Sequence, residues 1–108
     1  MAAGGGRLSQ DDLVSIEREM GYSVEEFRRV LPAAMRDWRI DGSGQQWRVL
    51  RADGEPVATL ALKTLAPRVI GALRIPVLAV RIDLNPNDPV LRAEFLRRFE
   101  RGFHRGGG

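Results

Sequence analysis

The chain has 108 residues, of which 44% are hydrophobic and 29% charged, and its formal net charge is +3. These values are typical of one globular domain and exclude a wholly disordered chain. The absence of cysteine excludes disulfides, thiolate metal sites and thiol catalysis. The most apolar window, residues 69–80, is shorter than the roughly 20 residues of a membrane-spanning helix. We therefore expect a soluble, cytoplasmic protein with no membrane contact.

The N-terminal part of the chain predicts a tail followed by a helix. Residues 1–7 are glycine-rich and lack the apolar core of a secretory signal, so we expect a disordered tail there. Ser9 is a suitable helix cap, Ile16 and Met20 share a helical face, and Gly21 is a natural stop. We predict a first helix between Ser9 and Met20.

A second helix start follows directly. Ser23 and Glu26 have the S-x-x-E spacing of a capping box, in which each side chain bonds the other residue's backbone amide. Phe27 and Leu31 then lie on one side of the helix. Pro32 should end or offset the helix, because proline lacks the amide hydrogen, and we expect only one further turn after it.

From residue 37 to residue 84 the period changes from helical to alternating, which predicts a β-meander. We expect four strands, and they cover residues 37–41, 47–49, 57–62 and 77–84. Glycines at residues 42–44 and 53–54 supply turns between the first three strands. Pro67, Gly71 and Pro76 interrupt residues 65–76, so we predict a loop or a short irregular strand there.

The last predicted element is an amphipathic helix. Asp88 is a suitable cap, Pro89 fits the first helical position, and the helix should reach about Phe103. Apolar residues recur along it every four positions, at Leu91, Phe95, Phe99 and Phe103. This stripe indicates a helix whose apolar side closes the core.

The order of these elements predicts a single α+β domain over residues 8–104. We expect a two-layer sandwich, in which an antiparallel sheet of about four strands is covered on one face by N-terminal helices and the C-terminal amphipathic helix. Residues 105–108 are glycine-rich and should form a flexible tail.

The chain contains no recognisable catalytic or metal-binding set. His104 is the only histidine, and the serines are explained as helix caps or turn residues. Gly42-Ser43-Gly44 lies between two predicted strands, whereas a phosphate loop joins a strand to a helix. Trp38 and Trp47 predict core or cross-strand packing, with a base-stacking platform as the alternative. We expect no enzyme activity, no cofactor and no metal, and we identify no family whose motifs match the chain.

Charge is unevenly distributed along the sequence. Residues 1–60 carry 8 basic and 10 acidic side chains, whereas residues 61–108 carry 9 basic and 4 acidic ones. Four arginines lie on the side of the last predicted helix opposite the phenylalanines, and they are Arg97, Arg98, Arg101 and Arg105. We predict that these arginines, which we call the arginine face, bind a partner. The alternative is a solvated face on which acids such as Glu94 balance part of the charge.

The leading functional hypothesis is a non-enzymatic interaction module, an accessory or assembly factor that binds an acidic surface of another protein. The alternative is weak nucleic-acid binding through the same arginines. The final pair, Gly107 and Gly108, is similar to the tail of ubiquitin-like sulfur carriers, which is activated as an acyl-adenylate. This resemblance implies an acyl or sulfur carrier as a second alternative, beside a small-molecule carrier with a cavity between helices and sheet. The oligomeric state stays open.

Overall fold

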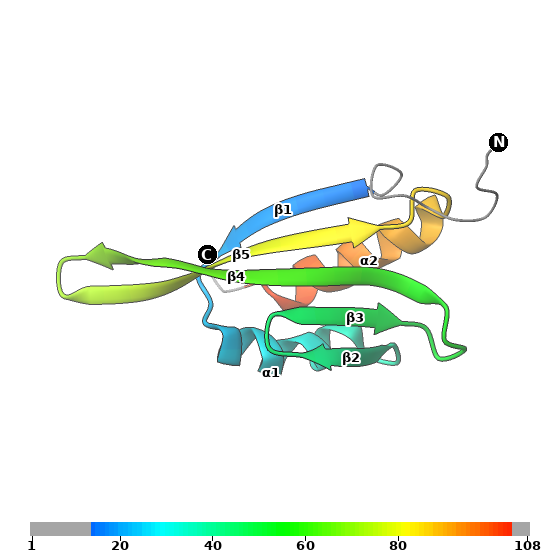
Figure 1. Cartoon of the computed structure of the whole chain (residues 1–108), viewed down its shortest axis with the longest axis horizontal. Helices are drawn as coiled ribbons and strands as arrows, with labels where there is room; N and C mark the ends of the chain where they lie inside the picture. The colour runs from blue at the N-terminus through cyan, green and yellow to red at the C-terminus, as the bar shows by residue number, and fades with distance from the viewer. Residues whose placement is uncertain (1–13, 105–108) are drawn as a thin grey trace.

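The computed structural model describes residues 14–104, which form one antiparallel sheet and two helices (Figure 1). In chain order the elements are β1 (Val14–Met20), α1 (Val24–Met35), β2 (Arg39–Ser43), β3 (Gln46–Leu50), β4 (Pro56–Ile70), β5 (Leu73–Leu84) and α2 (Pro89–Gly102). The five-stranded sheet has the order β1-β5-β4-β3-β2. Strands β2 to β5 thus form a meander, and the predicted α+β class is confirmed. The predicted tails, at residues 1–7 and 105–108, lie outside the described residues.

The predicted first helix is wrong over the part that the structure describes, because residues 14–20 form strand β1. β1 pairs with β5 in an unbroken antiparallel register, from Val14 opposite Leu84 to Met20 opposite Leu78. Ile16 and Met20 are four residues apart, and this spacing fits one face of a strand as well as one face of a helix. These residues form a strand because they pair with the edge of β5 that β4 leaves free. The sheet therefore has five strands rather than about four.

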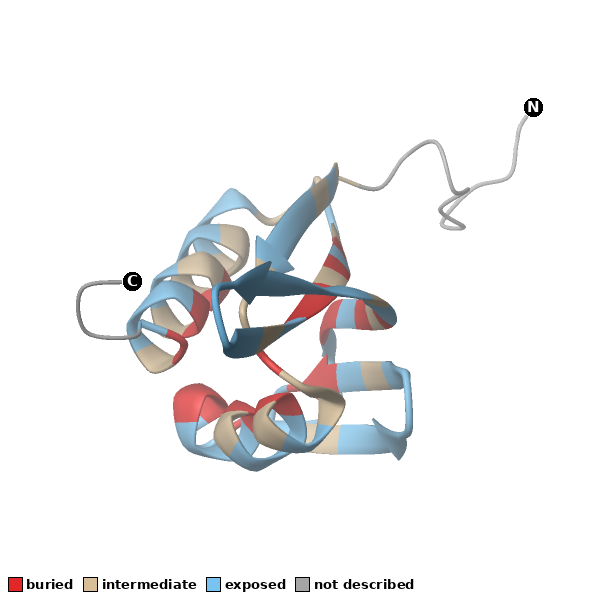
Figure 2. Ribbon diagram, turned by 90° about the vertical axis from the view of Figure 1, so that its left-hand side faces the viewer, coloured by how far each residue is buried: buried red, intermediate tan, exposed pale blue. Residues whose placement is uncertain are grey.

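The two helices cover the same face of the sheet (Figure 2). The predicted buried face of β5 is confirmed, since its alternate residues Leu78, Val80, Ile82 and Leu84 are all buried. The β4 partners of the last three are buried as well, and the pairs are Leu62 with Val80, Leu60 with Ile82 and Ala58 with Leu84. The core therefore lies between this face and the helices.

Each helix begins at the cap that the sequence predicts. Ser23 Oγ accepts a hydrogen bond from the Glu26 amide at 3.1 Å, and the Glu26 carboxylate accepts one from the Ser23 amide at 3.0 Å. The Asp88 carboxylate accepts from the Leu91 amide at 3.0 Å at the start of α2. α1 continues through Pro32 to its end, so the proline does not stop the helix, and the one further turn is present.

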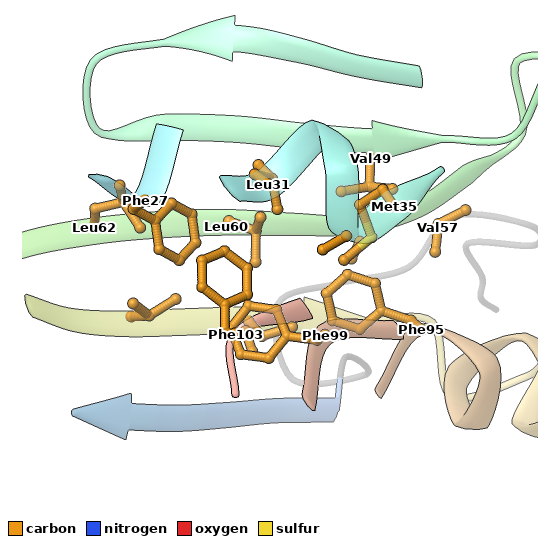
Figure 3. Packing of buried hydrophobic residues seen from close by; sticks show 14 of the residues in the cluster. Phe27, Leu31, Met35, Val49, Val57, Leu60, Leu62, Phe95, Phe99 and Phe103 are labelled. Carbon is orange, nitrogen blue, oxygen red and sulfur yellow. The ribbon is translucent and has the colours of Figure 1, made fainter. Parts of the chain in front are cut away.

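Stacked aromatic rings fill the space between the two layers (Figure 3). Phe95, Phe99 and Phe103 are buried as the stripe predicts. The Phe27 ring of α1 stacks on Phe103 with ring centroids 4.6 Å apart, and Phe99 lies 4.7 Å from Phe103. The end of α2 is therefore fixed to the start of α1 by direct ring contact.

Gly102 permits the close approach of the two helices. A Cβ atom at this position would overlap the Ala34 Cβ and lie 2.9 Å from the Ala34 Cα. Real Cβ atoms do not approach backbone so closely, so any larger residue at position 102 would push α1 and α2 apart.

Strands β4 and β5 extend beyond the rest of the sheet as a two-stranded hairpin (Figure 1). Of the two alternatives predicted for residues 65–76, the loop is wrong and the irregular strand is nearer the structure, because cross-strand pairs continue to Ile70 and Leu73 around a turn at Gly71, whose φ is +59°. Pro67 lies at a register shift between residues 65 and 68, where proline removes no ladder hydrogen bond. We call residues 65–76 the β-arm.

Candidate interaction surfaces

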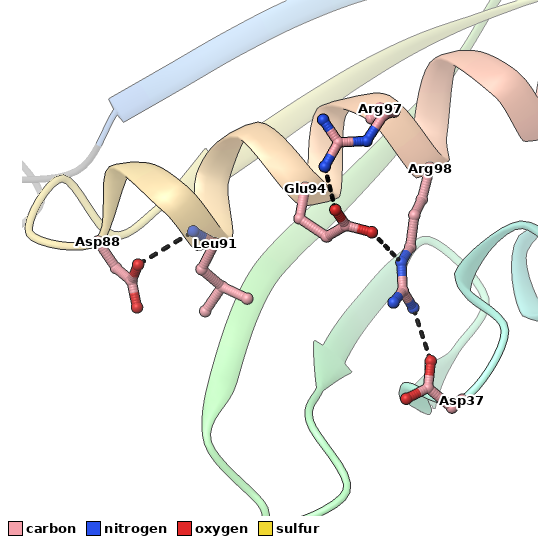
Figure 4. A network of polar contacts seen from close by, with 6 residues as sticks. All are labelled: Asp37, Asp88, Leu91, Glu94, Arg97 and Arg98. Carbon is pink, nitrogen blue, oxygen red and sulfur yellow. Dashed lines mark hydrogen bonds and ion pairs between the residues drawn. The ribbon is translucent and has the colours of Figure 1, made fainter.

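Arg98 of the arginine face joins the two helices rather than facing solvent (Figure 4). Its guanidinium donates hydrogen bonds to Asp37 at 2.9 Å, to Glu94 at 2.9 Å and to the Met35 carbonyl at 2.6 Å. It also lies 3.8 Å from the centroid of the Trp38 ring, and its side chain is only 16% exposed. All of these groups except Glu94 lie at or just after the end of α1, so Arg98 supplies the donors that this helix end lacks.

The contacts of Arg98 keep its partners ionised. The hydrogen bond from Arg98 holds the pKa of Asp37 below its ordinary value of 3.8. Hydrogen bonds from Arg98 and Arg97 hold the pKa of Glu94 below its ordinary value of 4.5. Burial by itself would lower the pKa of Arg98, but the hydrogen bonds with Glu94 and Asp37 outweigh it and raise the pKa. The cluster is fully ionised at neutral pH, as a structural ion-pair network requires.

The other arginines of the arginine face differ in their contacts. Arg97 forms an ion pair with Glu94 on the same helix. Arg101 is exposed in the last turn of α2 and has no hydrogen bond or ion pair with another residue of the 14–104 region. Arg105 lies outside the described residues. The structure therefore places Arg97 and Arg101 on the surface and Arg98 in the contact between the two helices.

The β-arm carries the largest apolar exposure apart from Val90. Val69, Ile70 and Leu73 are 58%, 57% and 59% exposed. In Figure 2 the outer part of the hairpin points toward the viewer and is coloured as exposed. Soluble chains leave single apolar residues at the surface, so three at the tip of one hairpin make it a candidate contact surface.

The two sides of the β-arm differ. Directly opposite residues of an antiparallel pair project to the same side. Ile70 pairs with Leu73, and Arg68 pairs with Ile75 two residues farther from the tip. These four residues therefore share one side, which we call the apolar side of the β-arm. Val69 and its partner Arg74 occupy the other side.

Both outer edges of the β-arm are unpaired among the described residues. β1 pairs with β5 only as far as Leu78, and β3 pairs with β4 only as far as Ala61. Beyond these points β4 and β5 have only each other as strand partners. A two-stranded hairpin is marginally stable in water when nothing covers it. The β-arm thus has both the exposed apolar side and the free backbone groups that a partner would cover.

A groove of about 620 Å³ lies at the base of the β-arm. Apolar side chains from three elements line it, and they are Met20, Tyr22, Ile75, Phe99 and Phe103. Charged side chains lie among them, and they are Arg18, Glu19, Arg68 and Glu100. The Tyr22 hydroxyl donates to the Phe103 carbonyl at 3.1 Å, and Arg18 pairs with Glu100 at 2.7 Å. We call this the arm-base groove, and the apolar side of the β-arm leads out of it through Ile75.

The face of the sheet opposite the helices carries acids and bases in alternation. Asp83 accepts hydrogen bonds from Ser15 and, at 3.2 Å, from Arg81. Arg48 of β3 donates to Asp41 of β2 at 2.7 Å. A surface whose charges are paired in this way has no large potential of one sign, which a nucleic-acid platform requires.

The tryptophans do not form the cross-strand pair considered from the sequence. Trp38 lies before β2, is buried and packs beneath Arg98. Trp47 lies opposite Gly42 and Leu60 in the register, and its indole nitrogen donates to the Gly44 carbonyl at 2.9 Å. The core interpretation holds for Trp38, while Trp47 is partly buried against the core.

The sequence analysis also considered the glycines at residues 42–44 as a phosphate loop and the acidic side chains as metal ligands. Gly42 and Gly44 have φ values of +131° and +62° in the β2–β3 hairpin, as a tight turn between strands requires. Within residues 14–104, no group of three or more His, Cys, Asp or Glu side chains is placed to hold a metal ion. No helix of that same stretch is long and apolar enough to cross a membrane.

The sequence signal for the β-arm was present but ambiguous. Leu73 and Ile75 alternate with Arg74, which is a strand pattern, but two prolines and a glycine interrupt the surrounding residues. A second signal is the charge, because residues 56–82 contain Lys63, Arg68, Arg74 and Arg81 and not one acidic side chain.

When compared with protein-family models, curated proteins and solved structures, the chain has no match.

Proposed function

We propose that the protein is a non-enzymatic interaction module that binds another protein through the β-arm. The observation that carries this proposal is the exposure of Val69, Ile70 and Leu73 at the tip of a hairpin whose edges lack strand partners in the described region. Such a ribbon offers both side-chain burial and backbone hydrogen bonds, the two contributions that strand addition at an interface combines.

The charge of the β-arm indicates what the partner surface should contain. Residues 56–82 hold four basic side chains and no acidic one, so the matching surface is acidic around an apolar centre. This agrees in sign with the acidic partner expected for the arginine face. Arg97 and Arg101 add positive charge on α2, whereas Arg98 already has four partners within the fold.

The test compares the β-arm with the arginine face in the full chain. Tagged wild type, an Ile70→Ser/Leu73→Ser variant and an Arg97→Glu/Arg101→Glu variant are used to capture proteins from the native cell. Val90→Ser is the matched control, because Val90 is 79% exposed on α2 and lies outside the β-arm. All three variants change exposed residues, so circular dichroism and thermal unfolding should match wild type.

We expect the β-arm variant to lose partners that the Val90→Ser control retains, identified by mass spectrometry. The loss should be at least about tenfold, since central apolar contacts dominate interface energies. Capture that survives the β-arm variant and disappears only with Arg97→Glu/Arg101→Glu would refute the β-arm as the contact and favour the arginine face instead.

Nucleic-acid binding is the second candidate, and the acid-free stretch of residues 56–82 is the observation that favours it. Binding of labelled oligonucleotides would then fall steeply with added salt, because binding releases counterions. The mixed charge on the open sheet face is the reason that we place this candidate second. The carrier alternatives would act at Gly107 and Gly108, which lie outside the described residues.

A further inference from the structure

We propose that the β-arm takes up an extended acidic segment of another protein as an additional strand, and that this strand pairs with the outer edge of β4. The part of this edge that β3 does not reach covers residues 63–70, and we call it the β4 free edge. The inference rests on the proposed function, because it names the mode of binding and the partner chemistry of the same β-arm.

Backbone groups point outward where the β4 free edge begins. The Leu62 amide donates to the Gln45 carbonyl at 2.8 Å, so the backbone groups of Leu62 face the side of β3. Thr64 is two residues farther along the same strand, so its amide and carbonyl face that side as well. β3 pairs with β4 only as far as Ala61. Thr64 therefore has no strand partner on this side within residues 14–104.

The turn of the β-arm fixes the direction of the backbone groups near the tip. Ile70 and Leu73 are opposite residues that close the turn at Gly71, so their amides and carbonyls point toward each other. In an antiparallel pair the groups of the next two residues point away from each other. The amide and carbonyl of Val69 therefore face outward from β4, and those of its partner Arg74 face outward from β5.

The outer edge of β5 is less suitable for an added strand. Pro76 has no amide hydrogen to donate. Gly21, which follows β1, already lies against this edge, because a Cβ atom there would be 3.4 Å from Ile75 Cγ2 and 3.9 Å from the Pro76 carbonyl oxygen. The β4 free edge also contains a proline, Pro67, but it spans about 23 Å, which is enough for a strand of ordinary length.

A pocket of about 340 Å³ lies beside the β4 free edge. It is lined by Thr64, Leu65 and Pro67 of β4, by Pro76 and Val77 of β5, and by residues 22–25 at the start of α1. Most of these side chains are apolar, and the acid among them, Glu25, is paired with Arg28 at 3.1 Å. In strand addition the backbone bonds give affinity and such pockets select side chains, so the partner segment should carry an apolar residue here.

The charge of the β4 free edge selects an acidic segment. Lys63 and Arg68 lie on this edge, and neither forms an ion pair with another residue of the described part of the chain. Residues 56–82 contain no acidic side chain, so an added strand meets only cations on β4 and on the adjoining part of β5. A second β-arm would bring the same cations, and like charges on paired strands are destabilising.

NMR with the full chain tests which edge is used. The probe is a peptide of about eight residues in which glutamate alternates with valine, and the control peptide has lysine in place of glutamate. The acidic peptide should bind with a Kd below about 1 mM and should protect the amides of Thr64 and Val69 from hydrogen exchange. The Arg74 amide should stay unprotected. Protection of Arg74 in place of Val69, equal binding of both peptides, or no binding would overturn the proposal.

Proline substitutions separate the backbone edge from the side chains. Val69→Pro removes an outward amide of β4, and its ring blocks the edge, so the acidic peptide should bind at least about tenfold more weakly. Val69→Ala keeps the amide, and Arg74→Pro removes the outward amide of β5, so each should change the Kd by no more than about threefold. Thermal unfolding verifies that the variants are folded. Equal binding by Val69→Pro and Val69→Ala would refute strand addition.

Charge reversal tests the chemistry of the partner. Lys63→Glu/Arg68→Glu should weaken the acidic peptide about tenfold and should allow the lysine peptide to bind. Arg29→Glu/Arg39→Glu is the matched control, because it changes the net charge equally at exposed positions of α1 and β2. It should leave both Kd values within about twofold of wild type. Equal effects of the two double variants would show that only the overall charge matters, and would refute a contact at this edge.

Capture from the native cell distinguishes a failure of this inference from a failure of the proposed function. Val69→Pro should lose the same proteins as Ile70→Ser/Leu73→Ser, whereas Val69→Ala should retain them. If only Ile70→Ser/Leu73→Ser loses them, the partner binds the tip, and strand addition alone is refuted. A doubled mass in light scattering that Val69→Pro abolishes, or an oligonucleotide bound at the edge, would refute the acidic segment. If neither the tip variant nor Val69→Pro alters capture, the proposed function fails as well.

Discussion

The two halves of strand β5 have similar sequences and opposite environments. From Leu78 to Leu84, alternate apolar residues are buried beneath the helices between β1 and β4. From Leu73 to Ile75, apolar residues alternate with a charge in the same way, yet Leu73 is 59% exposed. Alternation therefore predicts that the backbone is extended, whereas burial depends on what else in the fold reaches that part of the strand.

The arginines near the core and those of the β-arm also have opposite environments. Arg98 is held by Glu94, Asp37 and a backbone carbonyl, and its role is to close the contact between the helices. Arg68 and Arg74 project from a hairpin that has no acidic residue. The first arginine stabilises the fold, and the other two are available to a partner.

The sharpest test of the comparison is one substitution made in each half of β5. Leu78→Ala should lower the free energy of unfolding by about 3 kcal/mol, since it opens a cavity at a fully buried site. Leu73→Ala should change it by no more than about 0.5 kcal/mol. Urea unfolding of each variant measures both values at a concentration where the chain is monomeric. Equal losses would mean that the β-arm is part of the folding core.

A smaller difference is expected between two arginines of α2. Arg98→Ala should cost about 2 kcal/mol, because it removes a cation–π contact with Trp38 and the hydrogen bonds from the guanidinium to Asp37 and the Met35 carbonyl. Arg101→Ala should cost about 0.5 kcal/mol or less. Thermal unfolding of both variants provides the comparison. If Arg98→Ala unfolds at the same temperature as wild type, Arg98 has no structural role and is again a candidate binding residue.

The smallest effect is expected from pH. Hydrogen bonds from Arg98 hold the pKa values of Glu94 and Asp37 below their ordinary values of 4.5 and 3.8. The unfolded chain therefore takes up these protons at higher pH than the folded one, and stability falls as pH drops below about 4.5. Urea unfolding from neutral pH to about pH 3 should show this loss. The slope should be shallower in Arg98→Ala, and an identical slope would show that other carboxylates are responsible.

Local signals in the sequence predict correctly where the two helices begin and which side of α2 is buried. The capping box of Ser23 and Glu26, the Asp88 cap and the phenylalanine stripe of α2 all depend on neighbouring residues, and all are confirmed. The sheet could be predicted only where its strands are adjacent in the chain. β1 and β5 are far apart in sequence, so the pairing that makes residues 14–20 a strand leaves no local mark.

The candidate site was predicted less well than the fold. The spacing of Arg97, Arg98 and Arg101 places them on the outer side of a helix. It cannot predict that Asp37 and Trp38, which follow α1, contact Arg98. The prolines at 67 and 76 predict either a loop or a short irregular strand at residues 65–76, because a proline normally ends a strand that has neighbours on both sides. Here the hairpin extends beyond the ends of β1 and β3, so a proline on its outer edge breaks no hydrogen bond to a neighbouring strand.

The free edges of the β-arm also bear on how far association can proceed. An extended ribbon with an apolar side can add strand after strand and grow into a fibril. Lys63, Arg68 and Arg74 oppose such growth, because stacking ribbons in register would bring like charges together at every layer. In the function proposed above, the cations that attract an acidic partner surface are therefore also gatekeepers against the growth of a fibril.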